Sequence, residues 1–122
     1  MANRWTRKNS STGGATDCSE ALSGVDAVAH LAARVHAMRE SNPDSLSAFR
    51  TVNTEGTSRL AAMAAGAGVR RVVYASTIKV NGEQTTGSPF TESGVPNPND
   101  PYAISKWEAE QALWNTARRS SL

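Results

Sequence analysis

The chain has 122 residues, which is long enough for one modest domain and too short for two. Hydrophobic residues make up 39% of it and charged residues 20%, so it does not have the composition of a wholly disordered chain. The net charge is +2, but five of the thirteen basic residues lie in the termini. The other eight are outnumbered by eleven carboxylates, which argues against a basic face that binds nucleic acid.

The sequence also bears on membrane, location and metal. No apolar run approaches the ~18–20 residues of a membrane span, and residues 1–10 do not resemble a secretory signal, so we expect a cytoplasmic protein without membrane contact. The single cysteine, Cys18, excludes a disulfide framework and a cysteine-rich zinc site. His30 and His36 lack partners at ligand spacing, so we expect them to be structural and expect no metal site.

Residues 1–16 show no helical or strand periodicity and are rich in Asn, Ser, Thr and Gly, so we predict a disordered or irregular arm. Asp17 can cap a short helix over 18–23, with Glu20 three residues on and Gly24 at its end. The apolar run 26–32 is typical of a strand buried on both faces in a parallel sheet, although periodicity alone leaves a helix open.

Residues 44–65 place apolar side chains at three- and four-residue spacing, which predicts a long helix that ends at the glycines of 66–68. Asn53 falls on that apolar face, so we expect it to have a buried hydrogen-bond partner. Residues 71–76 predict a second buried strand. The order strand, helix, strand is a crossover unit with parallel strands, and the fold class is therefore α/β.

Residues 80–100 are rich in Gly, Pro, Asn, Ser and Thr, which predicts an unusually long loop of the kind that handles ligands at the carboxyl edge of a parallel sheet. Asp100 as cap and Pro101 at the first helical position then begin a helix over about 102–117. Tyr102 and Lys106 lie one turn apart on the same face of this helix.

Four segments carry a resemblance: VDAVAHLAA (25–33), NTEGT (53–57), GVRRVVYAST (68–77) and PYAISK (101–106). Each motif is weak alone, but their order and spacing resemble the central part of the extended short-chain dehydrogenases/reductases. Within them, the chain is most similar to the NAD-dependent epimerase/dehydratase family and its epimerases of the UDP-glucose 4-epimerase type. The resemblance covers residues 17–122 and implies NAD as the cofactor.

The resemblance implies a catalytic centre of Thr77, Tyr102 and Lys106. Tyrosine has an ordinary pKa of ~10, but an ammonium one helical turn away and a cationic nicotinamide nearby both favour its phenolate. Tyr102 would remove a proton from a sugar hydroxyl, and Lys106 would also hydrogen-bond the nicotinamide ribose. Thr77 would hydrogen-bond the same sugar oxygen and help to hold it in line.

Cofactor-binding residues are implied at the strand ends and on the helices: Leu31, Ala32, Ala33, Asn53, Ala75, Ser76, Tyr102 and Lys106. Small side chains at a strand end let its backbone approach the cofactor, but plain core packing is an equal alternative for Ala32 and Ala33. Asn53 would support the strand ends around the cofactor. Its alternative is an amide that bridges elements without a ligand, and both interpretations require a buried partner.

The family's glycine-rich turn, which cradles the pyrophosphate, has no counterpart, because Gly13 and Gly14 follow no strand pattern. We therefore expect residues 17–122 to be the central part of an NAD-binding domain. This would be a portion of a Rossmann-like doubly wound parallel sheet that lacks the first βαβ unit and the C-terminal substrate domain. We expect such a fragment to have little or no activity.

The leading hypothesis is an NAD-dependent nucleotide-sugar epimerase that transfers hydride reversibly at C4 of a UDP-sugar. One alternative is a nucleotide-sugar dehydratase or carbonyl reductase of the same superfamily; the other is a non-catalytic remnant or interaction module. Ile78 and Lys79 follow Thr77 where 4,6-dehydratases tend to carry an Asp-Glu pair, which weakens the dehydratase alternative. The resemblance implies a nucleotide-sugar substrate and, by analogy, a homodimer through the two long helices.

Overall fold

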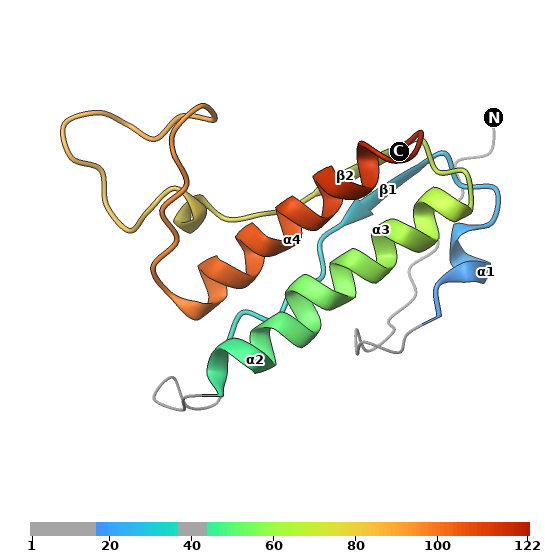
Figure 1. Ribbon diagram of the computed structural model, residues 1–122, viewed down its shortest axis with the longest axis horizontal. Helices are drawn as coiled ribbons and strands as arrows, with labels where there is room; N and C mark the ends of the chain where they lie inside the picture. The colour runs from blue at the N-terminus through green and yellow to red at the C-terminus, as the bar shows by residue number, and fades with distance from the viewer. Residues whose placement is uncertain (1–16, 37–43) are drawn as a thin grey trace.

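The computed structural model describes residues 17–36 and 44–122, and the arm predicted over 1–16 lies outside the described residues. Helices and two strands alternate along the chain (Figure 1). In order they are α1 (Ser19–Leu22), β1 (Ala27–His30), α2 (Ser45–Phe49), the π-helical segment η1 (Arg50–Glu55), α3 (Gly56–Gly66), β2 (Arg71–Tyr74), the 3-10 helix η2 (Ile78–Val80) and α4 (Pro101–Ala117).

The two strands form a parallel pair. Ala27 lies opposite Arg71, and the register continues to His30 opposite Tyr74. The chain passes from β1 to β2 through the long helix, so the predicted crossover unit and the α/β class are confirmed. Both strands are shorter than predicted, because the paired residues end at His30 and Tyr74. The N–H of Ala75 makes a last bond across the pair, to the carbonyl of His30 at 3.1 Å.

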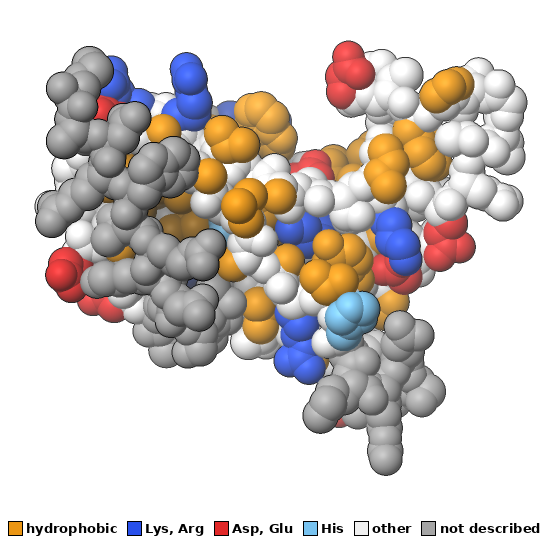
Figure 2. Space-filling view, turned by 180° about the vertical axis from the view of Figure 1, so that it is seen from behind, with side chains coloured by type: hydrophobic (Ala, Val, Ile, Leu, Met, Phe, Trp, Pro, Cys, Tyr) orange, Lys and Arg blue, Asp and Glu red, His pale blue; other side chains and the backbone are white. Residues whose placement is uncertain are grey.

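The prediction that both strands are buried on both faces is wrong for the described part of the chain. Val28 and His30 turn toward the helices, whereas Ala27 and Ala29 are exposed. Val73, between two half-buried residues of β2, is 57% exposed. Seen from behind, hydrophobic side chains lie open on the surface of the molecule (Figure 2). Helices α3 and α4 lie side by side in front of the sheet (Figure 1), so among the described elements only one sheet face is covered.

The helix predicted over 44–65 is present as one continuous run through α2, η1 and α3. Its middle turns are π-helical, a wider geometry than the prediction assumed. The helix ends as predicted: Gly68 has a φ of +78°, a left-handed conformation that glycine adopts without strain. Val69 then donates its N–H to the carbonyl of Ala64 at 3.0 Å, and the chain turns into β2.

A small hydrophobic core joins the ends of these elements. Buried Leu22, Ala64 and Val69 form its centre. The partly buried residues packed against them come from α1, both strands, α3 and the end of the chain: Cys18, Val25, Val28, Leu60, Met63, Val72 and Leu122. The short predicted helix over 18–23 is observed as α1, and Asp17 Oδ1 accepts a hydrogen bond from the N–H of Ser19 at 2.9 Å.

Helix α4 begins as the sequence predicts. Asp100 is its cap, its Oδ1 accepts from the N–H of Ala103 at 2.7 Å, and Pro101 is the first helical residue. The long loop before it swings away from the rest of the chain (Figure 1) and contains no helix or strand from residue 81 to 100. Within the described residues, none of the helices has the length and apolar character needed to cross a membrane.

Candidate active site

The predicted site residues gather around the carboxyl ends of β1 and β2 and the first turns of α4. Lys106 and Asn53 are the most buried of them, each with 1% of its surface exposed. The Lys106 ammonium lies at the end of β2. Its Nζ donates a hydrogen bond to the carbonyl oxygen of Ala75 at 2.6 Å and lies 4.1 Å from the centre of the Tyr74 ring. Burial lowers the pKa of Lys106, and the Glu110 carboxylate opposes that change. The ammonium is therefore fixed at the end of β2.

Tyr102 lies one turn before Lys106 on α4 and is half-buried. Its ring meets that of Phe49 edge to face, with 6.0 Å between the ring centres. The carbonyl of Tyr102 accepts a 2.7 Å hydrogen bond from Ser105 Oγ. The ring is thus packed between α4 and the end of α2.

Thr77 follows β2 and caps η2, where its Oγ1 accepts from the N–H of Lys79 at 3.4 Å. Lys79 Nζ in turn pairs with Asp100 Oδ2 at 2.7 Å, two residues before Tyr102. Within the described residues no direct hydrogen bond joins Thr77, Tyr102 and Lys106. The ion pair instead ties the segment that carries Thr77 to the start of the helix that carries the other two.

Asn53 has the buried partners that its position predicts. It is 1% exposed, and its Oδ1 accepts from the backbone N–H of Arg34 at 2.8 Å. Its Nδ2 donates to the carbonyl of Arg34 and to Ser105 Oγ, both at 3.0 Å. Both amide hydrogens are used, so Asn53 bridges the segment after β1 to α4 and acts on the strand end through Arg34.

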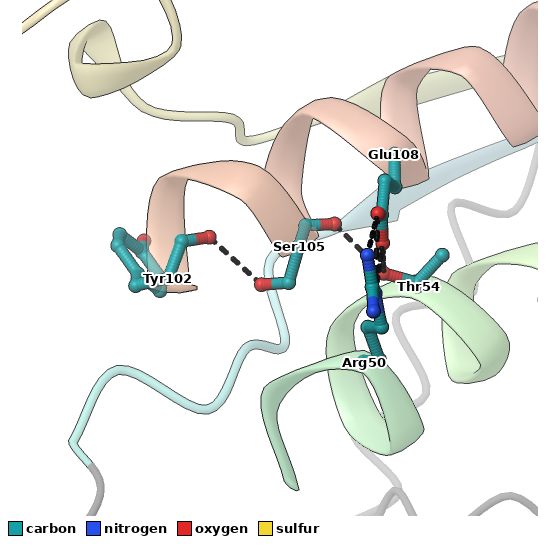
Figure 3. A network of polar contacts seen from close by, with 5 residues as sticks. All are labelled: Arg50, Thr54, Tyr102, Ser105 and Glu108. Atoms are coloured by element: carbon teal, nitrogen blue, oxygen red, sulfur yellow. Dashed lines mark hydrogen bonds and ion pairs between the residues drawn. The ribbon is translucent and has the colours of Figure 1, made fainter. Parts of the chain in front are cut away.

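A further polar network fastens η1 to α4 (Figure 3). Arg50 and Glu108 form an ion pair, with 2.9 Å from Arg50 Nε to Glu108 Oε2. Thr54 Oγ1 donates to the carbonyl of Ser105 at 3.0 Å, next to the Ser105 hydroxyl that is bound to Tyr102. These contacts set the position of the first turns of α4 and hence that of Tyr102.

The strand-end residues predicted to line a cofactor directly follow the carboxyl ends of the two strands. Leu31 is 72% exposed, Ala32 is exposed and Ala33 is half-buried. Ala75 and Ser76 are exposed after β2. The Ser76 hydroxyl is a hydrogen-bond donor to Glu110 Oε1.

His30 has the structural role that its sequence context predicts. Its Nε2 shares a 2.8 Å hydrogen bond with Thr57 Oγ1. Burial, and then the charge of Lys106, lower the pKa of His30 to about 4, so the ring is neutral at neutral pH. Its neighbour Tyr74 is held 5.3 Å away, ring centre to ring centre.

Sequence reasoning missed Tyr74, Ser105 and Glu110. Glu110 follows Lys106 by four residues, a spacing that places both on one face of a helix and could have identified it. Tyr74 turns inward because side chains alternate along β2. The sequence could have identified it only if the solvent-facing side of the strand, on which Val73 lies, had been known. Ser105 shows no signal beyond its place inside the Tyr-x-x-x-Lys motif.

Residues 6–122 match the sequence profile of the NAD dependent epimerase/dehydratase family. The chain belongs to this family. Over 108 residues it is 43% identical to a UDP-glucose 4-epimerase of Vibrio cholerae, and the match covers 88% of this chain and 33% of that protein.

Two solved structures of relatives share the fold. A UDP-glucuronic acid 4-epimerase of Bacillus cereus in complex with NAD has a TM-score of 0.75 at 25% identity, over 88% of this chain and 33% of that one. A dTDP-glucose 4,6-dehydratase of Streptomyces venezuelae with NAD bound has a TM-score of 0.72 at 40% identity, over 82% of this chain and 30% of that one. This family member therefore forms part of a Rossmann-like α/β fold and spans about a third of the length of these relatives.

The residues at the strand ends fit one end of NAD. Ala32 and Ala75 leave the backbone open to a ligand, and Lys106 brings a buried ammonium to the same edge. Two described glycines next to the strands have a left-handed φ, Gly24 before β1 and Gly68 before β2. Both lie near the amino ends of the strands, so they cannot cradle a phosphate at the carboxyl ends. Among the described residues, the strand ends thus offer exposed backbone and a nearby cation, and no glycine-rich turn adjoins them.

Proposed function

We propose that this chain carries the catalytic segment of an NAD-dependent nucleotide-sugar epimerase of the UDP-sugar 4-epimerase type. The observation that carries the proposal is the buried Lys106 ammonium, which is bound to Ala75 at the end of β2 one helical turn from Tyr102. The 43% identity to a UDP-glucose 4-epimerase supports the choice of substrate class.

Tyr102, Lys106 and Thr77 divide the work on the substrate. The Tyr102 oxygen takes the proton of the sugar hydroxyl at C4 in the oxidation step and returns it to the same oxygen in the reduction step. Lys106 stabilises the phenolate of Tyr102 through its positive charge, one helical turn away. Thr77 hydrogen-bonds the same sugar oxygen and keeps the hydroxyl in line with Tyr102.

The residues that would hold NAD are those predicted from the sequence: Leu31, Ala32, Ala33, Asn53, Ala75, Ser76, Tyr102 and Lys106. The Lys106 ammonium has donors beyond the one used by Ala75, and these would bind a ribose hydroxyl. Asn53 contributes by holding the backbone of Arg34 after β1. NAD, when bound, supplies an acceptor that takes up a hydride and gives it back.

The dehydratase of Streptomyces venezuelae, at 40% identity, makes a dehydratase the second candidate. The residues after Thr77 favour an epimerase instead. Ile78 is 65% exposed and apolar, and Lys79 is engaged with Asp100, so no carboxylate directly follows Thr77 to act on a neighbouring carbon. A carbonyl reductase is separated from both by a net change in nicotinamide absorbance during turnover, which an epimerase does not produce.

Partners and location belong to the same proposal. A nucleotide-sugar is the proposed substrate, since relatives of this chain were solved with UDP-glucuronic acid and UDP-glucose. A homodimer would use the long helix, which runs through α2, η1 and α3, together with α4. Between them a groove of about 570 Å³ is lined by Thr54, Glu55, Ser58, Arg59, Ala62 and Ala112. Light scattering of the purified protein tests the dimer, and cell fractionation tests the cytoplasmic location, which stays a prediction.

The test is to compare Tyr102→Phe and Lys106→Met with the parent sequence in the complete enzyme, following the interconversion of UDP-sugar epimers. We expect Tyr102→Phe to lower kcat at least about 100-fold, the usual contribution of a positioned acid or base. Trp114→Phe, an exposed position on the same helix, is the matched control and should keep full activity. An unaltered rate in Tyr102→Phe would refute the assignment.

The non-catalytic alternative has its own test. Titration of the 122-residue chain with NAD, followed by calorimetry, separates a binding segment from a remnant. Saturable binding that Lys106→Met weakens supports the proposed role of Lys106. Binding that is absent in the complete enzyme as well would favour the remnant or interaction module.

A further inference from the structure

The buried ammonium of Lys106 needs stabilising partners, and Ala75 supplies only one of them. A charged group with 1% exposure keeps its proton only where carbonyls, ring faces or carboxylates replace water. The Tyr74 ring provides such a face, because Lys106 Nζ lies 4.1 Å from its centre, well within the ~6 Å range of a cation–π contact. Tyr74 and Ala75 are adjacent, so the end of β2 supplies both contacts.

The ring of Tyr74, and not its hydroxyl, makes the useful contact. The hydroxyl is buried and has no hydrogen-bond partner within the described residues. The Thr57 side chain lies close enough to influence Tyr74, but its 2.8 Å hydrogen bond is made with His30 and not with the Tyr74 hydroxyl. A phenolic group without a partner is unfavourable in a core, so the aromatic face is what the site gains from this residue.

His30 and Glu110 hold this arrangement from two sides. The His30 ring packs against that of Tyr74, tilted by 31°, and is itself fixed by Thr57. Glu110 lies one turn after Lys106 and supplies the negative charge that favours the ammonium. Its carboxylate accepts a hydrogen bond from Ser76, which keeps it at the end of β2.

We propose that Tyr74 is a positioning residue whose ring face holds the Lys106 ammonium on the carbonyl of Ala75, with the Glu110 carboxylate as counter-charge. Its importance for catalysis rests on the proposed function, in which Lys106 stabilises the phenolate of Tyr102. The contact itself can be tested without any turnover.

The test measures the protonation of Lys106 directly. The 122-residue chain contains three lysines, Lys8, Lys79 and Lys106, so a sample labelled with ¹³C at lysine Cε gives three signals that Lys8→Arg and Lys79→Arg assign. Each signal is followed against pH by NMR. The titratable groups that face Lys106 are His30 from β1, Tyr74 from β2, and Tyr102 and Glu110 from α4, and of these only Tyr74 is changed in the main series.

Three substitutions at this position separate the ring from the hydroxyl. Tyr74→Phe keeps the ring face and should move the Lys106 pKa by less than about 0.3. Tyr74→Leu removes the ring and should lower the pKa by about one pH unit, a ten-fold loss of proton affinity. Tyr74→3,4,5-trifluorophenylalanine keeps the shape but weakens the negative face, so its Lys106 pKa should fall between the other two.

Lys79, which pairs with Asp100, is the internal control and should titrate unchanged in every variant. Glu110→Gln should also lower the Lys106 pKa, because it removes the counter-charge and keeps the shape. Circular dichroism checks that each variant is folded. If Tyr74→Leu does not fold, the comparison of the trifluorinated ring with Tyr74→Phe decides the question.

Equal Lys106 pKa values in Tyr74→Phe, Tyr74→Leu and the trifluorinated variant would overturn the proposal. That result is distinct from a failure of the proposed function. An active Tyr102→Phe enzyme refutes the catalytic assignment and leaves the contact between Tyr74 and Lys106 in place.

Discussion

Asn53→Ala is the substitution that tests most directly how the two halves of the site are held together. The Asn53 amide makes three hydrogen bonds, two with the backbone of Arg34 and one with Ser105 Oγ. Alanine removes all three and leaves the N–H of Arg34 without its partner in a partly buried position. Ser105 Oγ keeps its own bond to the carbonyl of Tyr102, so its loss is smaller.

The expected loss follows from these contacts. A hydrogen bond contributes about 0.5–1.5 kcal/mol net, so the three together stabilise the fold by about 2–4 kcal/mol. That is a large part of the ~5–15 kcal/mol by which a domain is usually stable. Urea unfolding followed by circular dichroism measures the free energy of unfolding, and Asn115→Ala, an exposed asparagine on α4, is the control.

The control substitution should change the free energy of unfolding by no more than about 0.7 kcal/mol, in the stabilising direction, because alanine is the better helix former. A loss below about 0.5 kcal/mol in Asn53→Ala would refute the reasoning. It would mean that the backbone of Arg34 finds water as readily as it finds the amide.

Three further predictions concern charge. His30 has its ordinary pKa of 6.5 in the unfolded chain and a pKa of about 4 in the folded chain. The free energy of unfolding should therefore fall by about 3 kcal/mol as pH drops from above 6.5 to 4. Urea titrations should show that His30→Gln abolishes this contribution. Asp100→Ala should destabilise α4 by about 1 kcal/mol at neutral pH. Burial acts to raise the Asp100 pKa, but hydrogen bonds from Lys79 and Ala103 outweigh it and lower that pKa. The difference in stability between Asp100→Ala and the parent should therefore vanish as pH falls through the lowered pKa. Arg50→Gln should have a small effect in low salt and a smaller one in high salt, because its ion pair with Glu108 is partly exposed to solvent.

Matched variants decide each of these. His36→Gln changes the other histidine, which is exposed, and should keep the parent's pH dependence; the same slope in His30→Gln would contradict the argument. Asn99→Ala, next to the cap, should leave stability unchanged, and an equal effect in both variants would rule out a role for the Asp100 carboxylate. Arg59→Gln is the exposed control for Arg50, and a salt-independent loss at Arg50 would show that packing, not charge, is the cause.

Elements with local signals could be predicted from the sequence. The start of α4 follows from Asp100 and Pro101, and the end of the long helix follows from the glycine at 68, because capping depends on a few neighbouring residues. The parallel pairing of β1 and β2 follows from the helix between them. The burial of the strands could not be predicted in this way, because it depends on which elements cover the second face of the sheet.

The site was predictable to the same extent. The spacing of Tyr102 and Lys106 places both on one face of α4, and periodicity is sufficient to establish that. The anchor of Lys106 was not predictable, because Tyr74 and Ala75 lie at and just after the end of β2, about thirty residues earlier. Their approach depends on how α4 lies against β2. Contacts between distant segments need the packing angle of the helix, which no local pattern contains.

Helix α4 is held against η1, the π-helical segment, by two consecutive residues. Asn53 and Thr54 are consecutive, yet both reach Ser105 of α4, one through its hydroxyl and the other through its carbonyl. The π turn is wider than an α turn, and such turns often occur at functional sites. Because Ser105 lies directly before Lys106 and three residues after Tyr102, this double contact fixes the helix face that carries both. A change in η1 should therefore displace Tyr102 and Lys106 together, without any contact between η1 and the substrate.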